Sequence, residues 1–93
     1  MFAIAFDLDQ ASLKEHYAKS ASQAYEDIRR ILEKHTFLRI QGSVYTSDKA
    51  DMTHVFYAMQ DLHKEPWIKH CVSDIRAFRV ENWSDFTSYI QGQ

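Results

Sequence analysis

The chain has 93 residues, a formal net charge of -2 at pH 7 and an aromatic content of 14%. This length predicts one domain, residues 1–93, with a modest core, and so much ring surface favours a second copy of the chain as a partner. The weak negative charge excludes a polybasic nucleic-acid binder, so contact with nucleic acid would need a local basic patch. A single cysteine, Cys71, excludes an intrachain disulfide.

The sequence shows no basic leader and no apolar segment of membrane-spanning length. Together with the lone cysteine, this predicts a cytoplasmic protein that has no membrane partner. Five histidines are scattered along the chain, and their spacing does not match a metal motif.

Apolar residues fill the first predicted strand, residues 2–8, FAIAFDL. They occupy both alternating faces, which predicts a central strand covered on both sides. The polar residues 9–19 predict a loop or a frayed helical turn. Residues 20–35 carry apolar side chains three and four positions apart, which predicts an amphipathic helix capped by Ser20 or Ser22.

Two short strands are predicted around Gly42, at residues 37–41 and 43–46, with the glycine at a bulge or tight bend. A second amphipathic helix is predicted at residues 49–64, and Pro66 marks its end. Each assignment follows from the spacing of apolar residues and from the turn residues between them.

The last third of the chain predicts a fourth strand at residues 72–81 and a short terminal helix at residues 83–91 that buries Trp83 and Phe86. The order is then β-α-β-β-α-β plus a C-terminal helix. That order is the ferredoxin-like split βαβ arrangement of the α+β class, with the first and third strands central and two helices on one face. The other face needs cover, which predicts a homodimer through the sheet face.

Asp7 is the first candidate site residue, because it ends a buried central strand, where ligands of α/β proteins often gather. A carboxylate there could hold a divalent metal or act as a general base. The alternative is that Asp7 only begins the following loop or caps its backbone.

The stretch RIQGSVYTS, residues 39–47, is the second candidate. Arg39 and the hydroxyl groups of Ser43 and Tyr45 could hold phosphate oxygens, and Gly42 would permit close approach of a ligand. The alternative is that these are ordinary side chains of two strands that meet at a glycine bend, with no role in binding.

The stretch DIRAFR, residues 74–79, is the third candidate. Arg76 and Phe78 lie on one face of the predicted strand and Arg79 lies on the other. Arginine beside an aromatic surface suits phosphate binding and base stacking, and it equally suits a dimer interface.

Four stretches resemble the virulence-associated protein D (VapD) family: MFAIAFDL, QAYEDI, QGSVYT and DIRAFRVENWSDFT. The resemblance runs from residue 1 to about residue 90, and the last motif is long and specific. It implies a homodimeric bacterial endoribonuclease, similar in fold to the small CRISPR-associated nuclease-like proteins. In some members it also implies the toxin of a toxin–antitoxin pair, silenced by a small antitoxin protein.

The resemblance also implies roles for individual residues of this chain. Asp7 becomes the catalytic acid at the end of the first strand, and Ser43, the hydroxyl of the QGS motif, becomes a second catalytic residue that positions a phosphate. The RNA-binding cations would be Arg39, Arg76 and Arg79.

Two chemical routes remain open for such a dimer, in which the two Asp7 carboxylates would converge near the twofold axis. They would share a proton, which gives acid–base catalysis with no required cofactor, or they would bind a divalent cation such as magnesium. The competing hypothesis is a non-catalytic dimeric adaptor that binds nucleic acid or protein, in which Asp7 is structural.

Overall fold

The protein is an α+β structure built on one sheet of four strands. The computed structural model describes residues 1–92. Its strands are β1 (Phe2–Leu8), β2 (Leu38–Gln41), β3 (Val44–Ser47) and β4 (Val72–Arg79). The sheet is antiparallel throughout, in the order β2-β3-β1-β4. The prediction that the first and third strands are central is therefore confirmed.

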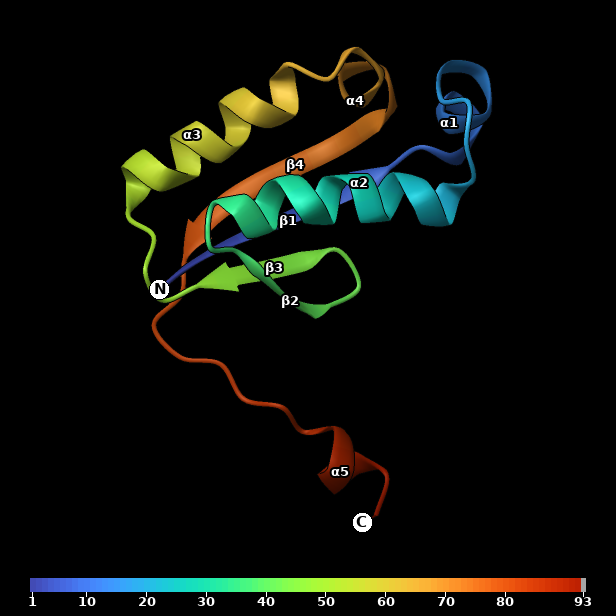
Figure 1. Cartoon of the computed structure of the whole chain (residues 1–93). Coiled ribbons are helices and arrows are strands. Elements are labelled where there is room, and N and C mark those ends of the chain that lie inside the picture. Colours follow the sequence, from blue (N-terminus) through green and yellow to red (C-terminus); the bar gives the residue numbers. More distant parts are fainter. Residues whose placement is uncertain (93) are drawn as a thin grey trace.

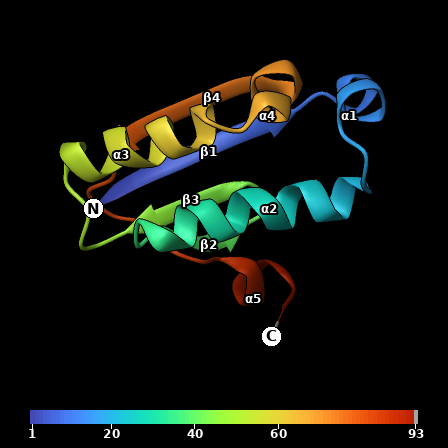
Figure 2. The same cartoon turned by 45° about the horizontal axis from the view of Figure 1, so that its top comes forward.

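Two long helices connect the strands. Helix α2 (Ala21–Lys34) lies between β1 and β2, and helix α3 (Met52–His63) lies between β3 and β4. Both helices cover the same face of the sheet (Figures 1 and 2). The order of strands and helices is compatible with the predicted ferredoxin-like arrangement.

The core lies between this helical layer and the sheet. The apolar side chains of β1 that face the helices meet the buried stripes of α2 and α3, and the central residues of the cluster are Ile4, Phe6, Ala24, Ile28, Leu32, Val55, Ala58 and Leu62. Burying each of the larger side chains contributes about 1.5–3 kcal/mol. The other face of the sheet carries no helix in the part of the chain that the structure describes, so the prediction of cover on both sides of the first strand is wrong within one chain.

Helix α1 (Gln10–His16) occupies most of the stretch that was predicted as a loop or a frayed helical turn. Asp9 caps it, because its carboxylate accepts a hydrogen bond of 3.0 Å from the backbone N–H of Ser12. Leu13 is the buried residue that ties this helix to the core. A seven-residue helix with one buried side chain shows little periodicity, which is why the sequence pattern did not indicate it.

Helix α4 (Pro66–Cys71) was also absent from the prediction. Pro66 follows α3 as predicted, but it stands in the first turn of α4, where a missing N–H group costs nothing. Its buried side chains are those of Ile68 and Cys71. The proline therefore separates two helices rather than a helix from a loop.

A hydrogen-bonded bridge joins the ends of α2 and α3. The ring atom Nε2 of His35 lies 2.6 Å from Oδ2 of Asp61, and Nζ of Lys64 donates to the same carboxylate at 3.2 Å. These two bonds, His35 first, lower the pKa of Asp61. The bridge therefore links α2 to α3 within the helical layer.

The C-terminal segment, residues 80–92, leaves the body of the molecule after β4 (Figure 1). Helix α5 covers only Thr87–Ile90, whereas the predicted helix began at residue 83. Trp83 and Phe86 are 50% and 65% exposed, so the prediction that they are buried is wrong. None of the helices formed by residues 1–92 has the length and apolar content needed to cross a bilayer.

Candidate active site on the open sheet face

Asp7 lies on the face of the sheet that the helices leave open. Its neighbours Phe6 and Leu8 point into the core, and strand alternation therefore turns the exposed Asp7 side chain to the opposite face. The pairing of β1 with β4 shifts register between Asp7 and Leu8. Such irregularities re-aim side chains and occur often beside active sites. The hydroxyl group of Ser73 donates to the Asp7 carbonyl at 3.2 Å, which holds the backbone at this point.

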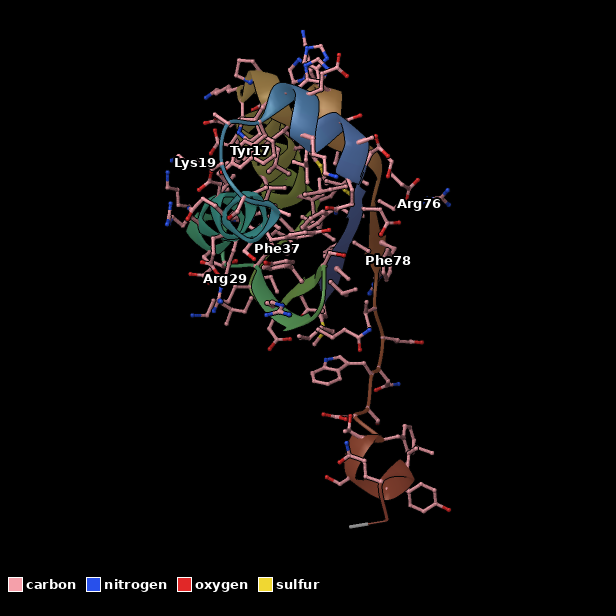
Figure 3. The ribbon with its side chains drawn as sticks, turned by 90° about the vertical axis from the view of Figure 1, so that its right-hand side faces the viewer. Tyr17, Lys19, Arg29, Phe37, Arg76 and Phe78 are labelled. Carbon is pink, nitrogen blue, oxygen red and sulfur yellow. The ribbon has the colours of Figure 1, made fainter. Side chains whose placement is uncertain are left out.

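A second carboxylate stands next to Asp7. The register pairs Asp7 directly with Asp74 of β4, so both side chains lie on the open face. Nε of Arg76 donates to both carboxylate oxygens of Asp74, each at 3.2 Å. Arg76 and Phe78 point away from the helices (Figure 3). Two acids and one cation thus lie together on exposed strand positions.

Asp74 was not singled out from the sequence, although it begins the DIRAFR stretch. The signal was available, because Asp74 and Arg76 are two residues apart and a strand places such residues on the same face. What the sequence does not contain is the register, which decides that Asp74 and not Ser73 stands opposite Asp7.

The candidates of the second stretch gather on the other side of the sheet. Arg39, Ser43 and Tyr45 line a cavity of about 390 Å³ between α2 and the β2–β3 hairpin. The remaining lining residues are Ser22, Tyr25, Glu26, Arg29 and Gly42. The Tyr45 side chain is 2% exposed, and burial raises the pKa of its hydroxyl group. The sequence did not indicate the α2 residues of this cavity.

Asp7 and Ser43 are neighbours in the sheet but their side chains lie on opposite faces. The Ser43 carbonyl accepts a hydrogen bond of 3.1 Å from the Phe6 N–H, so the turn before β3 lies beside the end of β1. The Ser43 side chain faces the cavity below α2, whereas the Asp7 side chain faces the open side. One chain therefore holds two separate groups of candidate residues at the same end of the sheet.

Arg79 lies apart from both groups. It pairs with Phe2, at the opposite end of β1 from Asp7. Phe78 pairs with Ala3, so Arg79 and Phe78 lie on different faces, as the strand pattern predicted. Within one chain, Arg76 is the predicted cation that lies near Asp7.

The histidine and cysteine side chains described next make contacts that stabilise the fold. His54 completes the capping box of α3 with Asp51, and the ring of His16 stacks on His70 with centroids 4.4 Å apart. Cys71 is fully buried, and burial raises the pKa of its thiol, which keeps it protonated. Among residues 1–92, no group of three or more histidine, cysteine, aspartate and glutamate side chains is placed to hold a metal.

The donor set on the open face nevertheless fits one kind of cation. Magnesium is commonly bound by one or two carboxylates, with water and phosphate oxygens completing its octahedron. Asp7 and Asp74 supply two adjacent, exposed carboxylates. The residues present are therefore sufficient for a magnesium ion that is also held by a phosphate group.

Comparison with known proteins identifies the family of the chain. Residues 1–87 match the family model described as CRISPR associated protein Cas2, and the α+β fold with its four-stranded antiparallel sheet is compatible with that family. The protein named endoribonuclease VapD homolog from Neisseria gonorrhoeae is 50% identical over 91 residues, which cover 98% of this chain and 99% of that protein. Endoribonuclease VapD from Dichelobacter nodosus is 47% identical over 92 residues, 99% of each chain. The chain belongs to the VapD family.

Proposed function

We propose that this chain is an endoribonuclease that cleaves RNA phosphodiester bonds, with Asp7 as its central catalytic group. The observation that carries the proposal is the exposure of Asp7 inside a central strand, where its nearest neighbours along the strand are core residues. Relatives that match almost the whole chain are named endoribonuclease VapD, which supports the same activity.

The chain's own residues suffice for a route without metal. Asp7 acts as the general base that takes the proton of a ribose 2′-OH group. The 2′-oxygen bonds to phosphorus while the bond from phosphorus to the 5′-oxygen breaks, and the leaving 5′-oxygen takes a proton from water, which gives a 2′,3′-cyclic phosphate and a 5′-OH end. Arg76 stabilises the charge that develops on the phosphate, because its bonds to Asp74 use Nε and leave the two Nη groups as donors. Asp74 positions that guanidinium group.

Where a divalent cation such as magnesium is bound, it supplies a Lewis acid for the phosphate, and Asp7 and Asp74 would hold it. The roles of Ser43, Arg39 and Tyr45 then lie in binding RNA at the cavity on the other face. Arg79 would contact RNA or a second chain at the far end of β1.

We also propose a homodimer formed through the open face of the sheet. Leu38 of β2 and Phe78 of β4 are 62% and 46% exposed. Such apolar side chains on an uncovered face favour a second copy as cover. A twofold contact there would bring the two Asp7 side chains toward each other, and sedimentation equilibrium measures the state directly. By its motifs, the chain would be the toxin of a toxin–antitoxin pair, with a small antitoxin protein as partner.

Cleavage of a defined RNA by the wild type and by Asp7→Asn tests the activity. Asp7→Asn should lower the rate at least tenfold, since general-base catalysis contributes about 10²- to 10⁴-fold. Cut ends that carry a 2′,3′-cyclic phosphate, formed equally in EDTA, support attack by the 2′-OH group. A 5′-phosphate and loss of activity in EDTA support the route with a metal. Equal cleavage by the two proteins contradicts the proposal and points to a contaminating ribonuclease.

A non-catalytic adaptor is the second candidate function. It is favoured by the exposed apolar side chains of the C-terminal segment, Trp83, Phe86, Tyr89 and Ile90. In that case the protein would bind RNA or a protein partner through these residues without cutting RNA. Asp7→Asn would then leave the affinity for that partner unchanged.

A further inference from the structure

Strand β4 forms an open edge of the sheet. It pairs with β1 on one side, and within residues 1–92 no strand pairs with its outer side. The strand is eight residues long, and six of these residues are exposed. Figure 2 shows β4 along one border of the sheet, beside α3 and α4. The unpaired N–H and C=O groups of such an edge are a template for pairing with another strand, and natural proteins usually shorten or cover it.

Apolar side chains of the helical layer lie beside this edge. A cavity of about 300 Å³ is lined by residues of α3, α4 and β4, among them Met59, Ile68 and Ile75. Met52 and Phe56 continue the line of Met59 along one flank of α3, because residues spaced by three and four share a helix face. Met52 is 58% exposed and Phe56 is 62% exposed. Exposed apolar side chains beside an unpaired edge indicate a surface that another chain covers.

The charges of β4 indicate which chain fits this edge. Asp74 and Arg76 lie on the open face, and Ile75 between them lies on the helical side, opposite Phe6. When a second copy of β4 pairs antiparallel with Ile75 opposite Ile75, each Asp74 stands opposite Arg76 of the other copy. Opposite charges in such a pair are stabilising. Registers centred on Asp74 or on Arg76 would set two like charges against each other. The irregularity of β4 lies before Asp74, outside these three residues.

We propose that β4 pairs with β4 of a second copy across a twofold axis at Ile75, which joins the two sheets edge to edge. The two α3 flanks that carry Met59 then face each other across this axis. On the open face, each Arg76 lies between Asp74 of its own chain, to which its Nε donates at 3.2 Å, and Asp74 of the second copy. Arg76 therefore contributes to the candidate sites of both copies. This edge contact is separate from the contact through the open face and does not depend on ribonuclease activity.

Disulfide trapping tests the edge contact and its register. Opposite Cα atoms of antiparallel strands are about 4.5–5.5 Å apart, which a disulfide can bridge, so Ile75→Cys should give a covalent dimer under mild oxidation. Ala77→Cys is the matched control, because it lies on the same side of β4 but would be about 13 Å from its copy. It should give at least about tenfold less covalent dimer. The wild type should give none, since Cys71 is buried. A contact through the open face would leave the two Ile75 positions apart, on the helical sides.

A second set of variants changes the charges in the Ile75→Cys background. Arg76→Asp sets two carboxylates opposite each other and should lower the yield of covalent dimer about tenfold. Adding Asp74→Arg restores opposite charges in the same register and should restore the yield. Arg30→Asp, an equal change of charge on α2, should leave the yield unchanged. With Ile75 intact, sedimentation velocity should rank the association of the charge variants in the same order, which keeps the test valid if the cysteine lowers stability.

Equal yields of covalent dimer from Ile75→Cys and Ala77→Cys would overturn the proposal. Failure of Asp74→Arg to rescue Arg76→Asp would also overturn it, because the pairing of these charges selects the register. A mixture of Ile75→Cys and Trp83→Cys that forms the mixed disulfide in preference to the symmetric one would assign the edge to the C-terminal segment of another copy. That result would replace the pairing of β4 with β4.

Discussion

Replacing Asp7 by asparagine should make the protein more stable, and the structure gives the size of the effect. The register sets Asp7 opposite Asp74, where cross-strand Cβ atoms are about 4.5–5.5 Å apart. Two charges at about 5 Å repel by about 0.8 kcal/mol in a water-like dielectric. The charge of Asp74 is already partly neutralised by Arg76, so Asp7→Asn should raise the free energy of unfolding by about 0.5 kcal/mol. For a chain of this size, that raises the thermal midpoint by about 2–4 °C.

Thermal unfolding at low and at high salt is the assay. Both carboxylates are exposed, so about 1 M salt should remove the gain by screening. Asp48→Asn removes another exposed charge, in the loop after β3, and should give no stabilisation. If Asp7→Asn left the midpoint unchanged at low salt, or lowered it, the two acids would not face each other as described. Functional side chains often reduce the stability of a protein. A substitution that removes such a side chain and raises the thermal midpoint is therefore typical of an active site.

Two further predictions concern the helical layer and the hairpin. Asp61→Asn should destabilise the protein at pH 7 by urea unfolding. Because the His35 and Lys64 bonds lower the pKa of Asp61 below the usual 3.8, the stabilisation is present above pH 3.8 and disappears as the pH falls below it. The difference between the variant and the wild type should therefore vanish in acid, and a difference that persisted there would contradict the role of the carboxylate charge. Gly42→Ala should lower the free energy of unfolding in urea by about 1 kcal/mol, because Gly42 has a φ of +41°, a backbone conformation that alanine adopts only with strain. No neighbouring atom would clash with the new Cβ, so the backbone strain is the whole effect. An unchanged urea midpoint would show that the turn relaxes without strain.

Much of the fold was predictable because its elements carry clear periods. The stripe of Ala24, Ile28 and Leu32 indicated α2, and the apolar run of β1 indicated a central strand. The misses have a common cause, because α1 and α4 are too short for periodicity to show. The aromatic residues around Trp83 were predicted to form a buried helix, but they are exposed. A sequence pattern does not distinguish an apolar side chain that is buried in the core from one that is exposed on a surface.

The candidate site was only half predictable for a different reason. Residue type and position in a predicted strand indicated Asp7, Arg39 and Arg76, but the grouping of these residues depends on strand register and face. The structure associates Asp7 with Asp74 and Arg76, and it associates Arg39 with Tyr45 and the α2 residues of the cavity. Pairing between strands far apart in the sequence decides both groups, and no local pattern encodes it.

The cleavage rate of Asp7→Asn compared with Asp9→Asn tests the central claim most directly. Both variants remove one carboxylate near the end of β1, and asparagine can replace Asp9 as the cap of α1. On a defined, internally labelled RNA, Asp7→Asn should be at least tenfold slower than the wild type, whereas Asp9→Asn should cut at the wild-type rate. Equal rates for all three proteins would contradict a catalytic role for Asp7.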